Sequence, residues 1–304
     1  MNTELTVIIP FKNEGEEVGK TIRSLNDMAC GNINIIVIND ASDDGYDYSS
    51  IASEKNVKYI IHKESLGPAQ SRAHGVKLCE TEYFLLLDAH MRALTKGWNK
   101  LIIEELKTDK RAVFCCKTER LLDNDKISDG EFGLGVNLNF EDLSYNWIQD
   151  HSSIQGTIMS IPCVMGASYC TNKRYWNKIR GLEGLRSYGY EEQLLSIKTM
   201  LEGGNCYAIT NVSFAHKFRT FKEVPYKAST VDYVFNQLYI IELFYPVKLK
   251  TKIFKKIKSE GDDNTFEIAL NNLSKIKNEI ISLKEYYKAN FSRELEYITD
   301  FTNL

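Results

Sequence analysis

Short apolar runs alternate with amphipathic stretches over the first hundred residues. The runs are rich in β-branched and aromatic residues, which is typical of strands buried on both faces. They comprise residues 5–10, 33–39, 57–61 and 83–87. Between them, residues 15–28 and 68–79 repeat apolar side chains at helical spacing. This alternation predicts a mostly parallel β-sheet flanked by helices, which is an α/β fold.

The pattern continues less regularly to about residue 226. Residues 112–119 are strand-like, 190–202 are helical and end at Gly203, and 206–218 are again strand-like. We expect these segments to extend the same sheet and to supply the acceptor side of a cleft. The predicted catalytic domain is therefore residues 1–226.

Residues 227–304 form the predicted second unit, a helical C-terminal extension. Apolar residues recur there at helical spacing, which favours helices packed on the first domain. They are Ile268, Leu273, Ile276, Ile280 and Leu283. The basic run within residues 248–264 allows two interpretations, a solvated linker or peripheral contact with an anionic membrane surface.

Composition and charge narrow the class of protein. The chain has 304 residues, 43% of them hydrophobic, and a formal net charge of −3, so it is globular and has no basic field for nucleic acid. Its seven cysteines lack C-x-x-C spacing and lie partly in apolar runs, as expected of reduced thiols. No signal peptide and no apolar run of about 18 residues is evident. We therefore expect a cytoplasmic protein.

Polar residues follow each of the four predicted strands. In parallel α/β sheets, ligands bind beyond the carboxyl ends of the strands, so these loops should share one rim. The candidate residues there are Pro10, Phe11, Asn13, Glu14, Asp40 and Ser42. No Walker A or G-x-G-x-x-G sequence is present. Phosphates would then need a bound cation, helped by a positive side chain such as Arg72.

The fourth strand ends on Asp88-Ala89-His90. Alternation along an extended chain directs Asp88 and His90 to the same side. A carboxylate with an imidazole suits Mn²⁺ or a similar cation, whereas the alternative is a helix-capping Asp followed by a surface His. The spacing alone leaves both interpretations open.

Several motifs in this order resemble glycosyltransferase family 2 and its relatives with the GT-A fold. These are P-F-x-N-E, D-x-S-x-D-G, S-R-x-x-G and the strand-terminal D-x-H. The stretch LLLDAHMRALTKGWNKLI is similar to the D-x-H segment of polypeptide N-acetylgalactosaminyltransferases. Three later segments resemble the same enzymes: FGLGVNLNF, IPCVMGASYCTNKRYW and the helix that leads to H-x-F-R. The likeness covers residues 5–226.

The resemblance implies a function and a set of site residues. It implies transfer of a hexose or N-acetylhexosamine from a UDP-sugar to a saccharide, lipid-linked or peptide acceptor. Mn²⁺ (or Mg²⁺) would be held by Asp88, His90 and His216. The implied nucleotide-sugar-binding residues are Pro10, Phe11, Asn13, Glu14, Asp40, Ser42, Arg72, Asp88, Gly166 and Ala167.

Glu191 and Glu192 begin the helix at the rim, where acids are favourable in any helix. In inverting family 2 members the second acid of a pair here is the base, which would be Glu192. In the retaining N-acetylgalactosaminyltransferases this position is Asn and no such base is used. MGAS also stands where those relatives have Gly-Gly, at Gly166 and Ala167. The stereochemistry therefore stays open.

Two other functions are compatible with parts of the sequence. A sugar-nucleotide-forming nucleotidyltransferase shares a related fold, but it normally needs a Gly-rich loop with Arg after the first strand, unlike PFKNEGEE. An inactive nucleotide-sugar-binding scaffold is the other alternative. Every metal-ligand position of the pattern is filled, which favours an enzyme.

Overall fold

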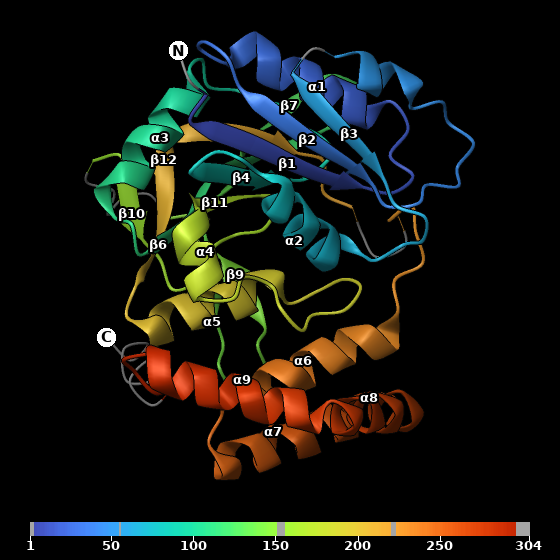
Figure 1. Ribbon diagram of the computed structural model, residues 1–304, viewed down its shortest axis with the longest axis vertical. Helices are drawn as coiled ribbons and strands as arrows, with labels where there is room; N and C mark the ends of the chain where they lie inside the picture. Colours follow the sequence, from blue (N-terminus) through green and yellow to red (C-terminus); the bar gives the residue numbers. More distant parts are fainter. Residues whose placement is uncertain (1–2, 55, 151–155, 220–222, 296–304) are drawn as a thin grey trace.

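The computed structural model describes residues 3–54, 56–150, 156–219 and 223–295. Its main element is a ten-stranded mixed sheet in the order β10-β12-β6-β11-β4-β1-β2-β3, with β5 paired to β12 and β7 to β6. Figure 1 shows the sheet between helices. The strands are β1 (Leu5–Phe11), β2 (Asn34–Asn39), β3 (Val57–Ile61), β4 (Tyr83–Leu87), β5 (Met91–Ala93), β6 (Ala112–Leu121), β7 (Ile127–Gly133), β10 (Ile158–Ser160), β11 (Ser168–Asn172) and β12 (Asn205–His216). A separate pair is formed by β8 (Val136–Leu138) and β9 (Tyr145–Trp147).

The N-terminal half is built as predicted. Strand β1 pairs in parallel with β2 and with β4, and β2 pairs in parallel with β3. Every residue of β1 and β4 is buried, because both faces of the sheet are covered. The carboxyl ends of these strands therefore lie at one edge of the sheet.

The second half extends the same sheet, as predicted. Strand β11 runs antiparallel to β4 and β6, whereas β12 runs parallel to β6. The short strand β5 was not predicted, and it pairs antiparallel with the end of β12, with Met91 opposite His216. This pairing brings His90, the residue before β5, beside the last residue of β12.

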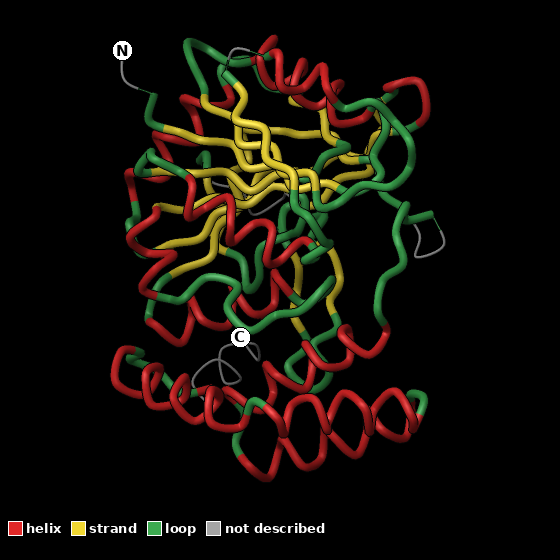
Figure 2. The backbone as a smooth tube through the Cα atoms, turned by 45° about the vertical axis from the view of Figure 1, so that its right-hand side comes forward, coloured by secondary structure: helices red, strands yellow, loops and turns green. Residues whose placement is uncertain are grey.

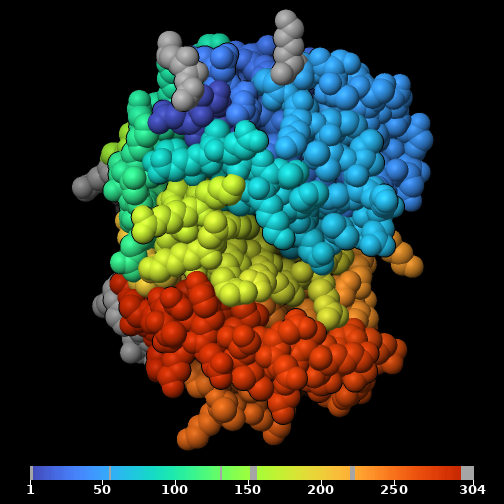
Figure 3. Space-filling view, viewed as in Figure 1, coloured from blue at the N-terminus to red at the C-terminus, as the bar shows by residue number. Residues whose placement is uncertain are grey.

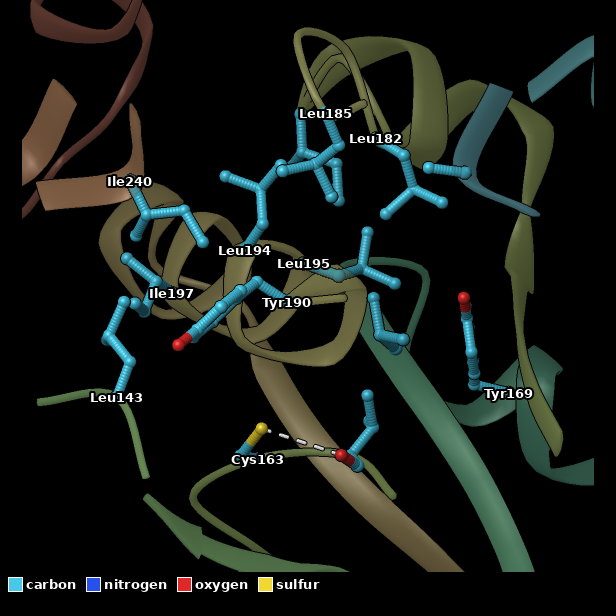
Figure 4. Close-up of a cluster of buried hydrophobic side chains, with 14 of the residues drawn as sticks. Leu143, Cys163, Tyr169, Leu182, Leu185, Tyr190, Leu194, Leu195, Ile197 and Ile240 are labelled. Atoms are coloured by element: carbon cyan, nitrogen blue, oxygen red, sulfur yellow. Dashed lines mark hydrogen bonds between the residues drawn. The ribbon is translucent and has the colours of Figure 1, made fainter. Parts of the chain in front are cut away.

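Helices cover both faces of the sheet. Residues of α1 and α3 share one apolar cluster with the sheet, and residues of α2, α4 and α5 belong to the other. Their bounds are α1 (Glu17–Met28), α2 (Pro68–Leu78), α3 (Trp98–Thr108), α4 (Lys173–Lys178) and α5 (Glu191–Glu202). Short 3-10 turns span Ser49–Ser53 and Asp123–Asp125. Figure 4 shows leucines of α5 packed among Leu182, Leu185 and Ile240.

The C-terminal extension is helical, as predicted, and packs against the sheet domain. It comprises α6 (Thr230–Phe244), α7 (Val247–Glu260), α8 (Asp263–Lys275) and α9 (Lys277–Asn290). In Figure 2 these helices lie in a layer beyond one end of the sheet, and in Figure 3 they form a continuous band against the earlier part of the chain. Buried residues of α6 and α5 share one core. Residues 220–222 and 296–304 of the two predicted units lie outside the described residues.

One expectation about the extension needs correction. The linker interpretation of residues 248–264 is wrong, because Val247–Glu260 is a helix. The apolar repeat falls on α8 and α9, where Leu273, Ile280 and Leu283 are buried, as expected of helices packed on the domain, whereas Ile268 is exposed.

Lysines of the basic helix α7 form ion pairs with acidic residues of the same chain. Four of its lysines lie 2.6–3.3 Å from carboxylate oxygens of Glu242, Glu141, Asp142 and Glu267. They are Lys250, Lys252, Lys256 and Lys258. Fewer positive charges are then available for an anionic surface, which weakens the argument for membrane contact. In the described part of the chain, no helix is both long and apolar enough to cross a bilayer.

Candidate active site

A cavity of about 720 Å³ opens at the carboxyl ends of β1, β2 and β4. The predicted rim loops meet there, as do the start of α5 and the residues after β12. Its lining includes the predicted residues Pro10, Phe11, Asn13, Glu14, Asp40, Arg72, Asp88, His90, Gly166, Ala167, Glu191, Glu192 and His216. Ser42 is not part of this lining, but it contacts a residue that is: its Oγ accepts a 2.9 Å hydrogen bond from the Asn13 N–H.

Asp88, His90 and His216 converge in this cavity. His216 Nε2 lies 3.0 Å from His90 Nε2 and 3.5 Å from Asp88 Oδ2. One potential ligand atom from each residue lies within 4.8 Å of the others. Ligand atoms bound at about 2.1 Å and at right angles are about 3 Å apart, so this spacing fits one divalent cation.

The protonation of these groups favours cation binding. Burial and the nearby His90 lower the pKa of His216 to about 3, so at neutral pH its imidazole is uncharged and can donate a lone pair. Burial raises the pKa of Asp88, but Arg72 and the two histidines lower it overall. The site thus offers a carboxylate and neutral imidazole nitrogen.

Arg72 connects the predicted metal ligands to the start of α5. Its Nη2 donates to Asp88 Oδ1 at 2.6 Å, and its Nη1 donates to Glu191 Oε1 at 3.1 Å. Its Nε is buried and has no hydrogen-bond partner among the described residues. Arg72 therefore fixes the orientation of Asp88, while its predicted role toward phosphate stays a prediction.

Glu14 lies in the cavity beside His90 and is bound by Arg219. Arg219 donates to both Glu14 carboxylate oxygens, at 2.7 and 2.6 Å, and His90 Nδ1 lies 3.3 Å from Glu14 Oε2. Burial raises the pKa of Glu14, but His90 and Arg219 lower it to about 2. The ionised Glu14 thus sits behind His90, as a carboxylate often does behind a metal-binding histidine.

Asp40 organises the rim between β2 and α2. Its carboxylate accepts hydrogen bonds of 2.8–3.1 Å from five groups. The donors are the His62 ring, the Ser65 and Ser71 hydroxyls, and the N–H groups of Leu66 and Gly67. These bonds hold the loop that leads into α2. The predicted contact of Asp40 with uridine stays a prediction, and it would have to displace or share one of these bonds.

Glu191 and Glu192 differ in their surroundings. Glu191 is held by Arg72 and by the Gly189 N–H at 2.9 Å, whereas the Glu192 carboxylate lies against Gly166. Burial and the neighbouring Glu191 raise the pKa of Glu192 to about 7. Burial raises the pKa of Glu191 as well. Because both oxygens of Glu191 already accept hydrogen bonds, Glu192 is the acid better placed to exchange a proton with a ligand.

We expect Gly166→Ala to lower activity more than stability. An added Cβ would lie 2.5 Å from Glu192 Oε1, so the end of that flexible side chain would have to move out of place. Donor turnover and thermal unfolding measured on the same preparations test this. Gly19→Ala in α1 is the matched control. An unchanged rate in Gly166→Ala would show that the position of the Glu192 carboxylate does not matter.

Comparison with known proteins relates the N-terminal part of the chain to one family. Residues 6–141 match the family model of glycosyl transferase family 2. This match covers less than half of the chain. The human probable polypeptide N-acetylgalactosaminyltransferase 8 is 26% identical over 242 residues, which is 73% of this chain and 37% of that protein. The chain thus spans well under half the length of this relative.

Solved structures show that the fold is of the GT-A type. A crystal structure of GalNAc-T7 with UDP, GalNAc and Mn²⁺ superposes with a TM-score of 0.77 at 15% identity, covering 98% of this chain and 56% of that one. Staphylococcus aureus TarS in complex with UDP-GlcNAc gives 0.60 at 13% identity, covering 95% and 88%. The predicted fold class and its resemblance to N-acetylgalactosaminyltransferase catalytic domains are confirmed.

Several residues around the cavity were not predicted as site residues. The ion pair of Glu14 with Arg219 joins positions 205 apart in sequence, and only the H-x-F-R motif hinted at it. Phe218 belongs to the same motif. Further aromatic side chains line the cavity, and they include Tyr145, Trp147, Tyr188, Tyr190, Tyr226 and Tyr233.

Proposed function

We propose that the chain is a metal-dependent glycosyltransferase that moves a hexose or N-acetylhexosamine from a UDP-sugar to a saccharide, lipid-linked or peptide acceptor. The observation that carries the proposal is the convergence of Asp88, His90 and His216 in a cavity at the carboxyl edge of the sheet. The match of residues 6–141 to the family 2 model supports it. So do the similar structures, one with UDP, GalNAc and Mn²⁺ and one with UDP-GlcNAc.

The residues present fit Mn²⁺ better than Mg²⁺ as the proposed cation. Two imidazoles and one carboxylate make a mixed nitrogen and oxygen set, whereas Mg²⁺ prefers oxygen ligands. When bound, such a cation supplies Lewis-acid stabilisation of the charge on a departing diphosphate.

The side chains around these ligands hold them in place. Arg72 fixes Asp88 through a 2.6 Å hydrogen bond. Glu14, itself clamped by Arg219, stands behind His90. Because His216 comes from a different segment than Asp88 and His90, this support sets the spacing of the ligands before any donor binds, which reduces the cost of binding. The loop of residues 10–14 and Asp40 lie on the uridine side in this proposal.

Glu192 is the proposed base that takes the proton of the acceptor hydroxyl. Glu191 is less suited, because Arg72 and the Gly189 N–H already bind both of its oxygens. A base whose pKa is about 7 accepts a proton efficiently at neutral pH. A base in this position corresponds to the inverting members of the family, so we expect inversion at the anomeric carbon.

The direct test is UDP release from a panel of UDP-sugars, with Mn²⁺ and with chelator, in the absence of acceptor. We expect slow hydrolysis of one donor that stops when the metal is removed. No release and no UDP binding would contradict the proposal. Formation of a UDP-sugar from UTP and a sugar phosphate, assayed in parallel, would favour the nucleotidyltransferase instead.

A further inference from the structure

A second hollow of about 660 Å³ adjoins the candidate active site. The two share five lining residues, Tyr188, Arg219, Val224, Tyr226 and Tyr233. The rest of the second hollow comes from the extension, namely Ala228, Thr230, Val234, Asp262 and Thr265. The hollow is thus a continuation of the active-site cavity toward the start of α8. Its volume lies within the range of about 300–1,000 Å³ that is typical of small-ligand sites.

Tyrosine rings line this second hollow and pack against neighbouring aromatic residues. Tyr188 and Tyr233 are 41% and 42% exposed. The Tyr233 ring packs on Tyr190 at 4.7 Å between centroids and lies so close to Gly189 that an added Cβ would approach it to 2.6 Å. Tyr188 contacts Tyr226 edge to face at 6.5 Å. Fixed rings with accessible faces suit the apolar C–H face of a sugar ring.

The polar groups of the hollow favour a neutral ligand rich in hydroxyls. Thr230 and Thr265 offer hydroxyl groups and Asp262 a carboxylate. Arg219 is the one basic residue among its described lining, and both of its Nη groups are bound to Glu14. A phosphate or diphosphate would therefore meet the negative charge of Asp262 with no free basic side chain in the described lining, which disfavours an anion. Sugar hydroxyls can donate to that carboxylate instead.

We propose that the second hollow is an acceptor subsite that binds the sugar units beyond the one that receives the transferred group, so that the enzyme acts on an acceptor of two or more neutral sugars. The inference rests on the proposed function and names its acceptor class. It assigns a role to the extension, since α8 supplies Asp262 and Thr265 to the subsite.

Thr265→Trp tests the subsite, because Thr265 lines the second hollow and does not line the active-site cavity. The backbone N–H that Asp262 caps at 2.7 Å is kept, so α8 should still form. Thr251→Trp, at an exposed position of α7, is the matched control for an added surface Trp. Asp262→Asn is a second variant, since Asn keeps the cap and removes the charge.

The full chain and its variants are applied to an array of mono- to tetrasaccharides and serine- and threonine-containing peptides, and donor hydrolysis is measured separately. We expect the wild type to bind glycans of two or more sugars. Thr265→Trp should bind them about tenfold or more weakly, as expected when ring stacking is blocked, and Asp262→Asn should also bind them more weakly. Donor hydrolysis should match the Thr251→Trp control.

The possible failures are separable. Donor hydrolysis without any glycan binding, equal glycan binding in Thr265→Trp, or binding of peptides in place of glycans would each overturn the subsite but not the proposed function. Absence of donor hydrolysis in the wild type would overturn the proposed function, while the array still decides whether the hollow binds saccharide.

Discussion

His216→Ala should reduce metal-dependent UDP release by about a thousandfold, because Lewis-acid stabilisation is worth several kcal/mol and each 1.4 kcal/mol is tenfold in rate. His216 ends β12 opposite Met91, and its Nε2 faces both His90 Nε2 and Asp88 Oδ2. Removing the imidazole leaves two ligands of three. Release is measured with each UDP-sugar at several Mn²⁺ concentrations, and Mn²⁺ affinity by electron paramagnetic resonance.

His90→Ala and Asp88→Asn should behave in the same way. Asp47→Asn, on the exposed loop after β2, is the control for the carboxylate change, and circular dichroism checks that each variant is folded. Full activity and unchanged Mn²⁺ affinity in His216→Ala would remove it from the ligand set. Loss of activity with unchanged Mn²⁺ affinity would instead place its role in donor binding.

The sequence predicted the strands that carry the site because their signal is local. Residues 83–87 are a continuous apolar run, and β4 has the same bounds. Once four such strands are parallel, the position of Asp88 and His90 at the carboxyl edge follows from topology. The same reasoning predicted that Glu14, Asp40 and Asp88 would line one cavity.

Features that depend on distant partners were not predictable in this way. The three residues of β5 carry no periodic pattern, and the strand exists because β12 is its neighbour. The basic residues of α7 resembled a linker because their counter-charges, including Glu141, Asp142 and Glu242, come from other segments. The contrast between Glu191 and Glu192 likewise depends on Arg72, which is 119 residues away from Glu191. Adjacent acids with the same sequence signal thus acquire different hydrogen-bond partners from tertiary contacts alone.

Glu192→Gln should reduce transfer to an acceptor by about a hundredfold or more, which is the usual contribution of a general base, while UDP affinity stays within about twofold of the wild type. The amide keeps the size of the side chain beside Gly166 but cannot accept the proton. Transfer is followed by product formation and UDP affinity by calorimetry. Glu54→Gln, at an exposed position, is the control.

The pH profile gives an independent test of the same residue. Because Glu192 acts when ionised and its pKa is raised to about 7 by burial and by Glu191, wild-type transfer should rise as pH increases through 7, and residual transfer in Glu192→Gln should lack this rise. Stability should change in the opposite direction. The folded pKa exceeds the ordinary value of 4.5, so the wild type loses stability as pH rises from 4.5 to 7, and Glu192→Gln removes that loss. If the product retains the donor's anomeric configuration and Glu192→Gln transfers at the wild-type rate, Glu192 is not the base, and its raised pKa reflects burial beside Glu191 alone.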